Sequence, residues 1–286
     1  MRTGTPLHRL NETAYELVER LLARPNSLGI AISRTESGSV IVDCGVNTPG
    51  GNSAGLEMAR IAMAGFGDVS LLPAGQQWKV PTVCVTSDHP VEACLASQYA
   101  GWKVHEGRYF AMASGPIRAA IGREELFARL AASAVGDCRE RPVTAVGLLE
   151  AKKLPADSIC RALAESARVD PRQLVLLVAR TSSAAGTLQV VARSLETALH
   201  KLDTLDFDLG RIVRGHASAP LPPLPHPPDD LEAIGRTNDS ILYGGEVVLE
   251  VDSDEASIAD VGPRSVSGAS AIHGEPFRDI FEKSGR

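Results

Sequence analysis

The sequence is poor in aromatic residues and contains no long hydrophobic run. Phe, Trp and Tyr together make up 4% of the 286 residues, too few for the rows of stacking rings that bind single-stranded nucleic acids. The formal net charge of −6 argues against a phosphate-backbone partner. The stretch MRTGTPLHRL lacks the apolar core of a signal peptide, and no apolar run reaches membrane-spanning length. We therefore expect a cytoplasmic protein that binds a small molecule rather than nucleic acid or membrane.

Cysteines are few, odd in number and scattered along the chain. None belongs to a C-x-x-C pair or lies near a histidine at metal-ligand spacing, which predicts buried, reduced thiols and no metal site. The five are Cys44, Cys84, Cys94, Cys138 and Cys160. The composition is otherwise globular, with 44% hydrophobic residues and 26 glycines. A chain of this length can bury one large core or two modest ones.

Hydrophobic periodicity predicts a mixed α/β fold. Short β-rich runs alternate with amphipathic stretches, and Asn11 stands where it can cap a helix that ends before Pro25. Strands are expected in LGIAIS, SVIVDCGV, TVCVTS, AVGLLE and LVLLVA, and helices in LEMARIAMAGFG, REELFARLAASA and ADSICRALAESA. The proline-rich stretch 220–230 should run extended over the surface. Residues 235–252 are expected to form a tight loop followed by a hairpin or strand.

The stretch TSSAAGTLQVVARSLETALHKLD, residues 181–203, carries two patterns on one predicted helix. Its apolar positions form a continuous face from Leu188 to Leu202, typical of a helix packed on a core. A second, polar stripe consists of Gln189, Arg193, Glu196 and His200. The simplest interpretation of this stripe is a solvated face with an Arg193–Glu196 pair worth a few tenths of a kcal/mol. The alternative is a stripe that faces a ligand.

Other polar stretches lie next to predicted strand or helix ends, where a backbone can approach a ligand. TPGGNSAG could bind an anion at a helix N-terminus or form an ordinary turn. SQYAGW and YFAMASGPIRA suit a planar heterocycle as well as a core edge. Thr181, Ser182 and Ser183 follow a strand directly, a usual position for ligand contacts, although capping would explain one of them. The GRTNDS stretch could be a plain turn.

No nucleophile constellation is visible. The chain contains no G-x-S-x-G elbow, no cysteine with an assignable histidine partner and no H-E-x-x-H motif. Residue chemistry alone therefore indicates an α/β protein with a possible cleft that carries an arginine and a glutamate.

Five stretches taken together resemble one known family. GGNSAGLEMARIAMAGFGDVSLL, ACLASQYAGWKV, YFAMASGPIRA, VARTSSAAGTLQVVARSLETALHKL and GRTNDSILYGG occur in the order and at about the spacing of the methenyltetrahydromethanopterin cyclohydrolases. The resemblance spans roughly residues 10 to 250. It implies hydrolysis of 5,10-methenyl-tetrahydromethanopterin to 5-formyl-tetrahydromethanopterin in one-carbon metabolism, and a homotrimer with no metal or prosthetic group. It also implies a two-domain α/β subunit with the substrate in an interdomain cleft. We expect two lobes, residues 1–140 and 141–286.

The resemblance also assigns roles to individual residues. It implies that Glu196 and Arg193 are the catalytic pair, with Arg193 keeping Glu196 largely ionised, and it gives His200 no role. The substrate-binding residues that it implies are Gln98, Tyr99, Ser114, Gly115, Pro116, Thr181, Ser182, Ser183, Gln189, Arg236, Thr237, Asn238 and Asp239. Arg180 departs from the family pattern, because a proline is expected there in the archaeal enzymes. Two alternatives stay open: a catalytically silent pterin-binding homologue, and a cyclohydrolase acting on methenyl-tetrahydrofolate.

Overall fold

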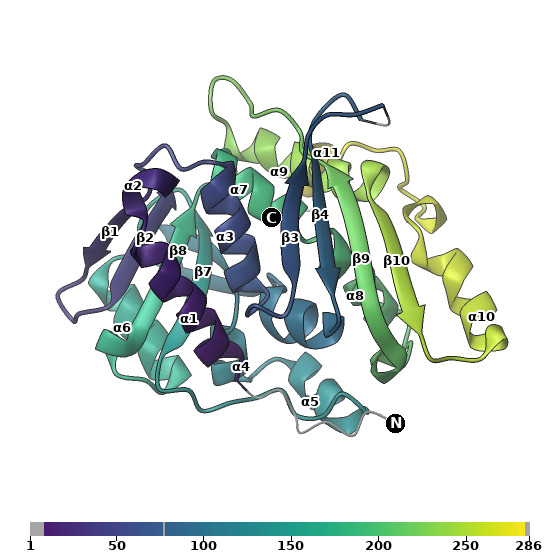
Figure 1. The fold of residues 1–286 in the computed structure, drawn as a ribbon, viewed down its shortest axis with the longest axis horizontal. Helices are drawn as coiled ribbons and strands as arrows, with labels where there is room; N and C mark the ends of the chain where they lie inside the picture. Colours follow the sequence, from purple (N-terminus) through teal and green to yellow (C-terminus); the bar gives the residue numbers. More distant parts are fainter. Residues whose placement is uncertain (1–8, 77, 284–286) are drawn as a thin grey trace.

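Two β-sheets and the helices around them make up the structure, a computed structural model that describes residues 9–76 and 78–283 (Figure 1). The larger sheet has the strand order β1-β2-β8-β7-β6-β5, and the smaller one β10-β9-β4-β3. The predicted α/β class is confirmed, whereas the division into two lobes and the cleft between them stay predictions. No helix in the described ranges has the length and apolar character needed to cross a membrane.

The six-stranded sheet has a parallel centre, β2-β8-β7, and antiparallel strands outside it. Its strands are β1 (Ala31–Arg34), β2 (Val40–Gly45), β5 (Trp102–Glu106), β6 (Tyr109–Ser114), β7 (Ala145–Ala151) and β8 (Leu174–Ala179). In β8, Val175 and Leu177 belong to the core on one face, while Leu174 and Leu176 belong to the core on the other. Burial on both faces explains why the predicted central strands read as unbroken apolar runs.

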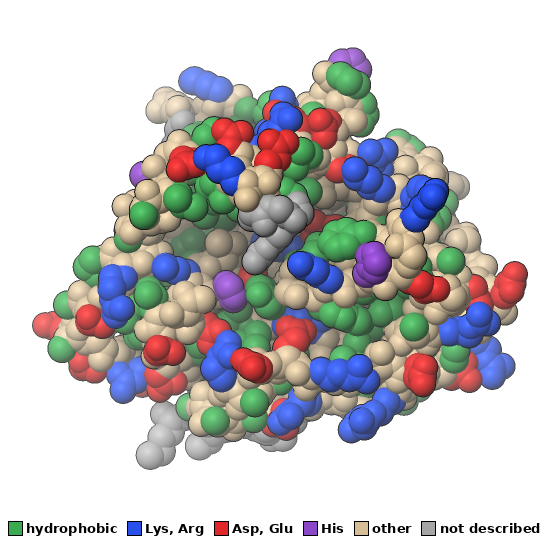
Figure 2. Space-filling model, turned by 180° about the vertical axis from the view of Figure 1, so that it is seen from behind, with side chains coloured by type: hydrophobic (Ala, Val, Ile, Leu, Met, Phe, Trp, Pro, Cys, Tyr) green, Lys and Arg blue, Asp and Glu red, His purple; other side chains and the backbone are tan. Residues whose placement is uncertain are grey.

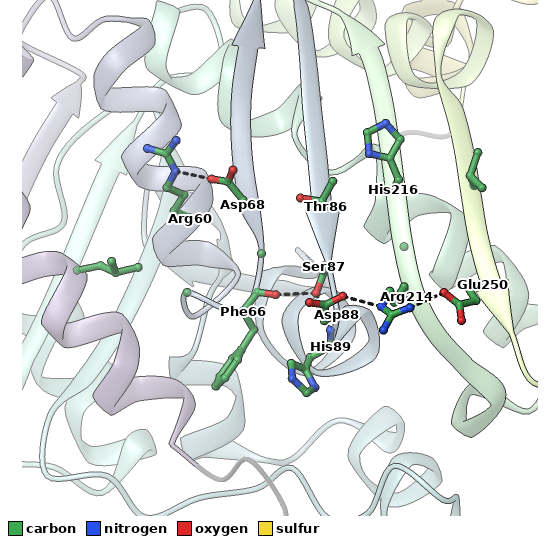
Figure 3. A pocket seen from close by; sticks show the side chains of 15 residues that line it. Arg60, Phe66, Asp68, Thr86, Ser87, Asp88, His89, Arg214, His216 and Glu250 are labelled. Carbon is green, nitrogen blue, oxygen red and sulfur yellow. Dashed lines mark hydrogen bonds and ion pairs between the residues drawn. The ribbon is translucent and has the colours of Figure 1, made fainter. Parts of the chain in front are cut away.

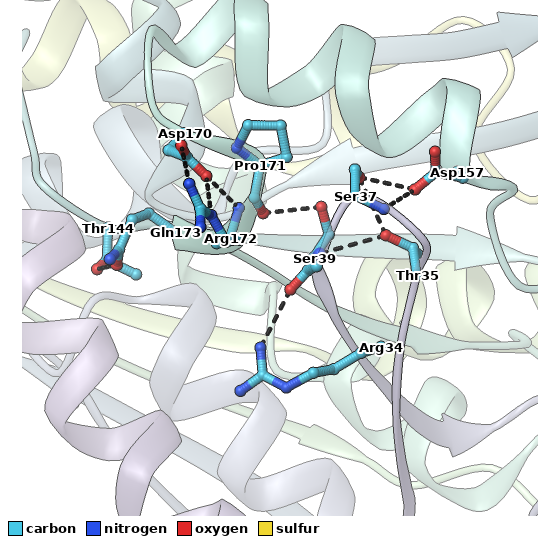
Figure 4. Close-up of polar contacts among 11 residues, drawn as sticks. Arg34, Thr35, Ser37, Ser39, Thr144, Asp157, Asp170, Pro171, Arg172 and Gln173 are labelled. Carbon is cyan, nitrogen blue, oxygen red and sulfur yellow. Dashed lines mark hydrogen bonds and ion pairs between the residues drawn. The ribbon is translucent and has the colours of Figure 1, made fainter.

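Helices cover both faces of this sheet. They are α1 (Leu10–Leu22), α2 (Pro25–Leu28), α3 (Asn52–Ala62), α4 (Ile117–Ile121) and α6 (Asp157–Ala167), with a 3₁₀ turn η2 (Pro171–Gln173). Helix α5 (Glu125–Ala132) packs instead into the hydrophobic cluster beneath the smaller sheet. The β1–β2 turn is held against α6 and η2 by polar contacts (Figure 4). Ser37 donates to Asp157 from its backbone and its hydroxyl, and Ser39 Oγ donates to the Pro171 carbonyl. These contacts fix the outer hairpin to the helical layer.

Asn11 does not cap α1, contrary to the sequence-based prediction. The helix begins at Leu10, and Arg9 occupies the capping position. Asn11 is fully buried. Its amide nitrogen donates to the Pro116 carbonyl at 2.7 Å, and its oxygen accepts from the backbone N–H of Val146 at 2.8 Å. The side chain therefore ties α1 to β7 and to the turn before α4, a long-range task that outweighs local capping.

The four-stranded sheet is antiparallel throughout and covered by helix on one face. Its strands are β3 (Asp68–Leu72), β4 (Thr82–Ser87), β9 (Ile212–Pro220) and β10 (Glu246–Val251). Val83 and Val85 of β4 belong to one hydrophobic cluster with Leu195 and Leu199 of α8 (Ser194–Thr204). The opposite face carries exposed side chains such as Val248. Each sheet draws strands from both sides of residue 140.

The predicted 181–203 helix is broken in two. α7 (Ala184–Val191) ends at Ala192, and α8 begins after Arg193. In an unbroken helix the Ala192 carbonyl would accept from the N–H of Glu196; here it accepts from Gln98 Nε2 at 3.1 Å. Neither glycine nor proline lies at the break, and a side chain inserted into the ladder is a recognised cause of such interruptions.

Helices α3 and α7 pack together between the two sheets (Figure 1). A methyl group on Gly55 of α3 would lie 2.9 Å from the Leu188 Cβ and 3.0 Å from the Ala185 carbonyl oxygen of α7. Only glycine therefore permits this approach. Gln98 reaches the α7–α8 break from η1 (Val91–Gln98), a buried π-helix that follows β4. π-helices are rare in proteins, and those that occur are often found at functional sites.

The remaining segments complete the smaller sheet. Residues 221–229 form no regular structure, as predicted for the proline-rich stretch. They lead into α9 (Asp230–Gly244) and strand β10, and η3 (Leu209–Arg211) precedes β9. After β10 come α10 (Glu255–Ser265), η4 (Ser267–Ala269) and α11 (Phe277–Lys283). The predicted strand near residue 250 is confirmed, but the predicted tight loop at 235–240 is wrong because those residues lie inside α9.

Candidate functional site

Arg193 lies at the α7–α8 break and is the centre of a buried polar cluster. Its Nη2 donates to Gln189 Oε1 at 3.1 Å and to Ser114 Oγ at 3.3 Å. The same nitrogen lies 2.6 Å from Glu150 Oε1. That contact lacks hydrogen-bond geometry, so charge attraction holds the pair. Strands β6 and β7 and helix α7 thus converge on one guanidinium.

Glu150 is the residue of this cluster that the sequence reasoning missed. It lies at the carboxyl end of β7 with 15% of its side chain exposed, and Arg193 has 9% exposed. A charge so far removed from water is costly unless a partner is close. The only signal in the sequence was a glutamate near the end of an otherwise apolar strand, a usual position for site residues in α/β folds.

Glu196 lies in the first turn of α8 and is 6% exposed. Burial raises the pKa of Glu196 to about 7, although Arg193 and Arg118 oppose the shift. Arg193 favours the ionised form of Glu196, as expected, but burial outweighs this effect, and the ion pair of Arg193 is with Glu150. A carboxyl group with a pKa near neutrality can both accept and return a proton at physiological pH.

Aromatic and cationic side chains stack beside Glu196. The Arg118 guanidinium lies 5.0 Å from the centre of the Tyr99 ring, and the Tyr99 and His200 rings stack with centroids 4.8 Å apart. Arg118 has a fully buried side chain, which pairs with Glu124 at 2.6 Å. Burial and the negative charge of Glu196 raise the pKa of Tyr99. His200 therefore faces an ordered stack, whereas the sequence had left it as a possible surface residue.

Several buried polar atoms in this region have no hydrogen-bond partner within the described structure. They are Gln98 Oε1, Glu150 Oε1, Gln189 Nε2, Arg193 Nε and Ser194 Oγ. Buried polar groups are almost always satisfied in native proteins, so a concentration of exceptions calls for an explanation. A polar ligand or ordered water between these side chains would supply the partners. Gln98, Ser114, Gln189, Arg193 and Glu196, five of the predicted site residues, belong to this region.

The predicted residues that follow Ser114 have structural contacts. Gly115 adopts a φ of +90°, and its N–H donates to the Ser97 carbonyl at 2.9 Å. The Pro116 carbonyl accepts from Asn11, and Pro116 occupies the capping position of α4. Both residues shape the turn that presents Ser114 to Arg193.

The loop Thr181–Ser183 is held by internal contacts. Ser182 donates to Asp230 of α9 from its backbone at 3.1 Å and from its hydroxyl at 2.6 Å. Ser183 caps α7 by accepting from the Gly186 N–H at 3.0 Å. Arg180, which departs from the family pattern, pairs with the same Asp230 at 3.0 Å. The capping interpretation is therefore confirmed for Ser183, and Arg180 and Ser182 join this loop to α9.

Residues 236–239 do not form a site loop but a turn of α9. Arg236 pairs with Glu232 at 2.9 Å. Thr237 Oγ1 and Asn238 Nδ2 donate to carbonyls one turn earlier in the same helix, and Asp239 accepts from the N–H of Phe277. Consecutive helical residues point in different directions, so the four side chains do not all share one face, and their substrate-binding role stays a prediction.

The surface carries a separate pocket of about 810 Å³ on the outer face of the four-stranded sheet (Figure 3). Its charged groups are paired with one another: Arg60 with Asp68 at 3.4 Å, and Arg214 with Asp88 at 2.9 Å. It contains none of the predicted site residues. Because that pocket holds none of the predicted residues and its charges are paired, the polar cluster around Arg193 is the better candidate site.

Seen from behind, the molecule is hollowed near its middle, and charges of both signs are interspersed (Figure 2).

Comparison with known proteins identifies the family. Residues 9–286 match the family described as "Cyclohydrolase (MCH)". The methenyltetrahydromethanopterin cyclohydrolase of Rhodopirellula baltica is 43% identical over 280 residues, covering 96% of this chain and 81% of that protein. Those of Methylobacterium organophilum and Methanococcoides burtonii are 41% and 34% identical, each over 96% of this chain and 84% and 85% of the relative. The chain therefore belongs to the methenyltetrahydromethanopterin cyclohydrolase family.

Proposed function

We propose that the protein hydrolyses 5,10-methenyl-tetrahydromethanopterin to 5-formyl-tetrahydromethanopterin, reversibly, with Glu196 as the general base. The observation that carries this proposal is a buried carboxyl group one turn from an arginine that a second carboxylate fixes in place. The names of the relatives support the substrate. Membership in this family and the unsatisfied polar atoms beside Arg193 together favour this site over the pocket on the outer sheet face, whose charged side chains are paired with one another.

The chemistry asks little of the protein beyond placement and proton transfer. The methenyl carbon is part of an amidinium-like cation and is already electrophilic. One water must be held in line with that carbon while a base takes its proton as the C–O bond forms. The ionised form of Glu196 is that base. No cofactor is needed for this step, because the substrate itself supplies the positive charge.

Arg193 acts through placement. Its guanidinium is held from three sides by Gln189, Ser114 and Glu150, and its Nε faces no hydrogen-bond partner within the described structure. That free N–H is the group that would donate to the water or to the oxygen formed from it. Burial holds the pKa of Glu196 near neutrality against the opposing charges of Arg193 and Arg118, and a base with such a pKa suits this step.

The substrate is proposed to lie against this cluster, with Gln98 and Tyr99 as further contacts. Gln98 presents an unpartnered carbonyl oxygen, and Tyr99 offers a ring beside the break. The Thr181–Ser183 loop is largely engaged with the protein itself: the Ser182 N–H donates to Asp230, the Ser183 N–H donates to the Arg180 carbonyl, and the Thr181 carbonyl accepts from Thr187 Oγ1. The side chains of residues 236–239 are not part of this proposed contact surface.

The decisive experiment compares Glu196→Gln with Leu195→Ala. The glutamine keeps shape and hydrogen bonding but removes the base, so the hydrolysis rate should drop by roughly 10² to 10⁴ while substrate binding changes much less. Leu195 lies on the apolar face of the same helix turn, and its truncation should cost roughly 2 to 5 kcal/mol of stability through a cavity. Loss of the methenyl absorbance reports the rate. A Glu196→Gln enzyme within a few-fold of the unmodified rate would reject the proposal.

The same assay separates the alternatives. A silent pterin-binding homologue would bind the methenyl substrate without consuming it. A folate cyclohydrolase would consume methenyl-tetrahydrofolate faster than the methanopterin derivative under the same conditions. We propose the methanopterin substrate because the relatives that match nearly the whole chain are named methenyltetrahydromethanopterin cyclohydrolases.

We also propose that the enzyme works as a homotrimer in the cytoplasm. The exposed face of the four-stranded sheet, with Leu72 at 52% and Val248 at 67% exposure, would be easier to explain if subunits packed on it. Light scattering at micromolar concentration should then give about three times the 30.2 kDa chain mass. A clean monomer would contradict this part of the proposal alone.

A further inference from the structure

The proposed reaction releases a proton that has to leave the protein. The methenyl substrate is a cation and the formyl product is neutral at the reacting centre. When water adds, one of its protons passes to Glu196. The second proton leaves the oxygen as the C=O bond forms, and the nitrogen whose bond to carbon breaks takes up one proton. These last two transfers balance, so the proton on Glu196 must reach solvent before the next turnover.

Glu196 cannot deliver this proton to bulk water directly, because it is 6% exposed. Its titratable neighbours are poor acceptors. Arg118 and Arg193 are already cationic, and burial raises the pKa values of Cys94 and Tyr99, so that both keep their protons near neutral pH. A relay must therefore come from another side chain close to Glu196.

His200 meets the geometric requirements. It follows Glu196 by four residues on α8, where side chains lie on the same helix face with Cβ atoms about 5 to 6 Å apart. Its ring is fixed by stacking on Tyr99 at 4.8 Å with an interplanar angle of 20°. His200 is half-buried and lines a groove of about 790 Å³ between α8, β10 and α10. His200 therefore lies one helical turn from the base and also lines the groove.

We infer that His200 carries the proton from Glu196 to the solvent in this groove. The Glu196 carboxyl gives its proton to one ring nitrogen, directly or through one water. The imidazolium then loses the proton of its other nitrogen to water or buffer in the groove, and the ring returns to the neutral form. No atom or electron other than the proton changes place. The inference depends on the general-base role proposed for Glu196.

The surroundings of His200 keep its ring neutral and ready to accept. Burial lowers the pKa of His200, Arg129 and Arg118 add to the effect, and Asp203 opposes it. Tyr99 faces the ring from η1, and Lys201 lines the same groove from α8. Because the pKa of Glu196 is about 7 and that of His200 is lowered, the transfer to the imidazole runs uphill, and loss of the imidazolium proton to solvent in the groove draws it to completion.

The test uses two substitutions of His200 with different shapes. His200→Gln keeps polarity, and His200→Phe keeps the stack on Tyr99, but neither accepts a proton. In dilute buffer both should hydrolyse substrate roughly 10- to 10²-fold more slowly, at or below the usual worth of an acid–base group. Added imidazole should restore much of the rate in a saturable manner. Lys201→Gln, a change in the same groove, should behave like the unmodified enzyme.

Other outcomes overturn the inference in distinguishable ways. Full activity of both His200 variants in dilute buffer would show that no relay is needed. A slow His200→Phe enzyme that imidazole does not restore would assign His200 a packing role. Glu196→Gln is the separate check on the base: it should be slow with and without imidazole. If it is fast, the proposed function fails before the relay is considered.

Discussion

Glu196 gives a stability test that needs no substrate. Its pKa is about 7 in the folded protein and 4.5 in its ordinary environment. The folded state therefore holds the proton more tightly than the unfolded state. As pH rises from about 4.5 to 7, the unfolded chain ionises first, so the free energy of unfolding falls. At about 1.36 kcal/mol per pH unit, the loss amounts to about 3 kcal/mol.

The assay is urea unfolding of the unmodified protein and Glu196→Gln at pH values near 4.5 and near 8. Glutamine does not titrate, and all other groups are common to both proteins, so their contributions cancel in the difference. The variant should gain about 3 kcal/mol relative to the unmodified protein between the two pH values. A difference that stays within about 1 kcal/mol would mean that Glu196 is solvated, and the buried-base argument would fail with it.

Three further substitutions test the surroundings of the site. Arg193→Lys keeps the charge but loses the planar fork, so turnover should fall roughly 10- to 10²-fold with little change in melting temperature; normal activity would leave Arg193 with a structural role only. Glu150→Gln leaves Glu196 as the carboxylate nearest Arg193, so the pKa of Glu196 should fall and the acid limb of the kcat/KM profile should move to lower pH. An acid limb at the same pH in the variant would contradict an electrostatic influence of Glu150 on Glu196. Gly55→Ala should cost about 1 to 3 kcal/mol of unfolding free energy by pushing α3 from α7, as measured by denaturant titration, and an unchanged midpoint would show that the helices relax.

The central strands were predictable because the local pattern of apolar and polar residues reflects their burial. TVCVTS and LVLLVA are β4 and β8 with the predicted bounds. The first alternates between buried and more exposed positions, and the second is apolar throughout because helices cover both its faces. Such information lies within six consecutive residues, so no distant contact was needed to read it.

The break between α7 and α8 could not be predicted from its own residues. The stretch VVARSLE has an uninterrupted helical pattern and no helix breaker. The Ala192 carbonyl at the break accepts instead from Gln98, 94 residues away. The break decides where Arg193 points, and so the partner of this arginine was also hidden from a helical wheel that assumed a straight axis.

The prediction for the GRTNDS stretch was wrong because its local composition indicates a turn, whereas the fold makes it helical. Its composition is typical of a turn, because Asn and Asp compete for backbone hydrogen bonds. In the structure GRTNDS lies within α9, and Asp229 caps this helix by accepting from two backbone N–H groups. Thr237 is fully buried and bonds within its own helix. Capping and tertiary packing together outweighed a weak local preference.

The parallel pairing of β2 with β8 sets a condition on how the chain folds. It joins Val42 to Leu177, residues separated by most of the length of a small domain, and the smaller sheet is completed only when β10 pairs with β9. Closing such loops costs entropy before any contact rewards it, so folding should be slow relative to local-contact proteins. During synthesis β2 can pair with β1, but its other edge stays open until β8, which ends at residue 179, has left the ribosome. A nascent chain halted before that point would expose this apolar strand edge and would depend on chaperones to stay unaggregated.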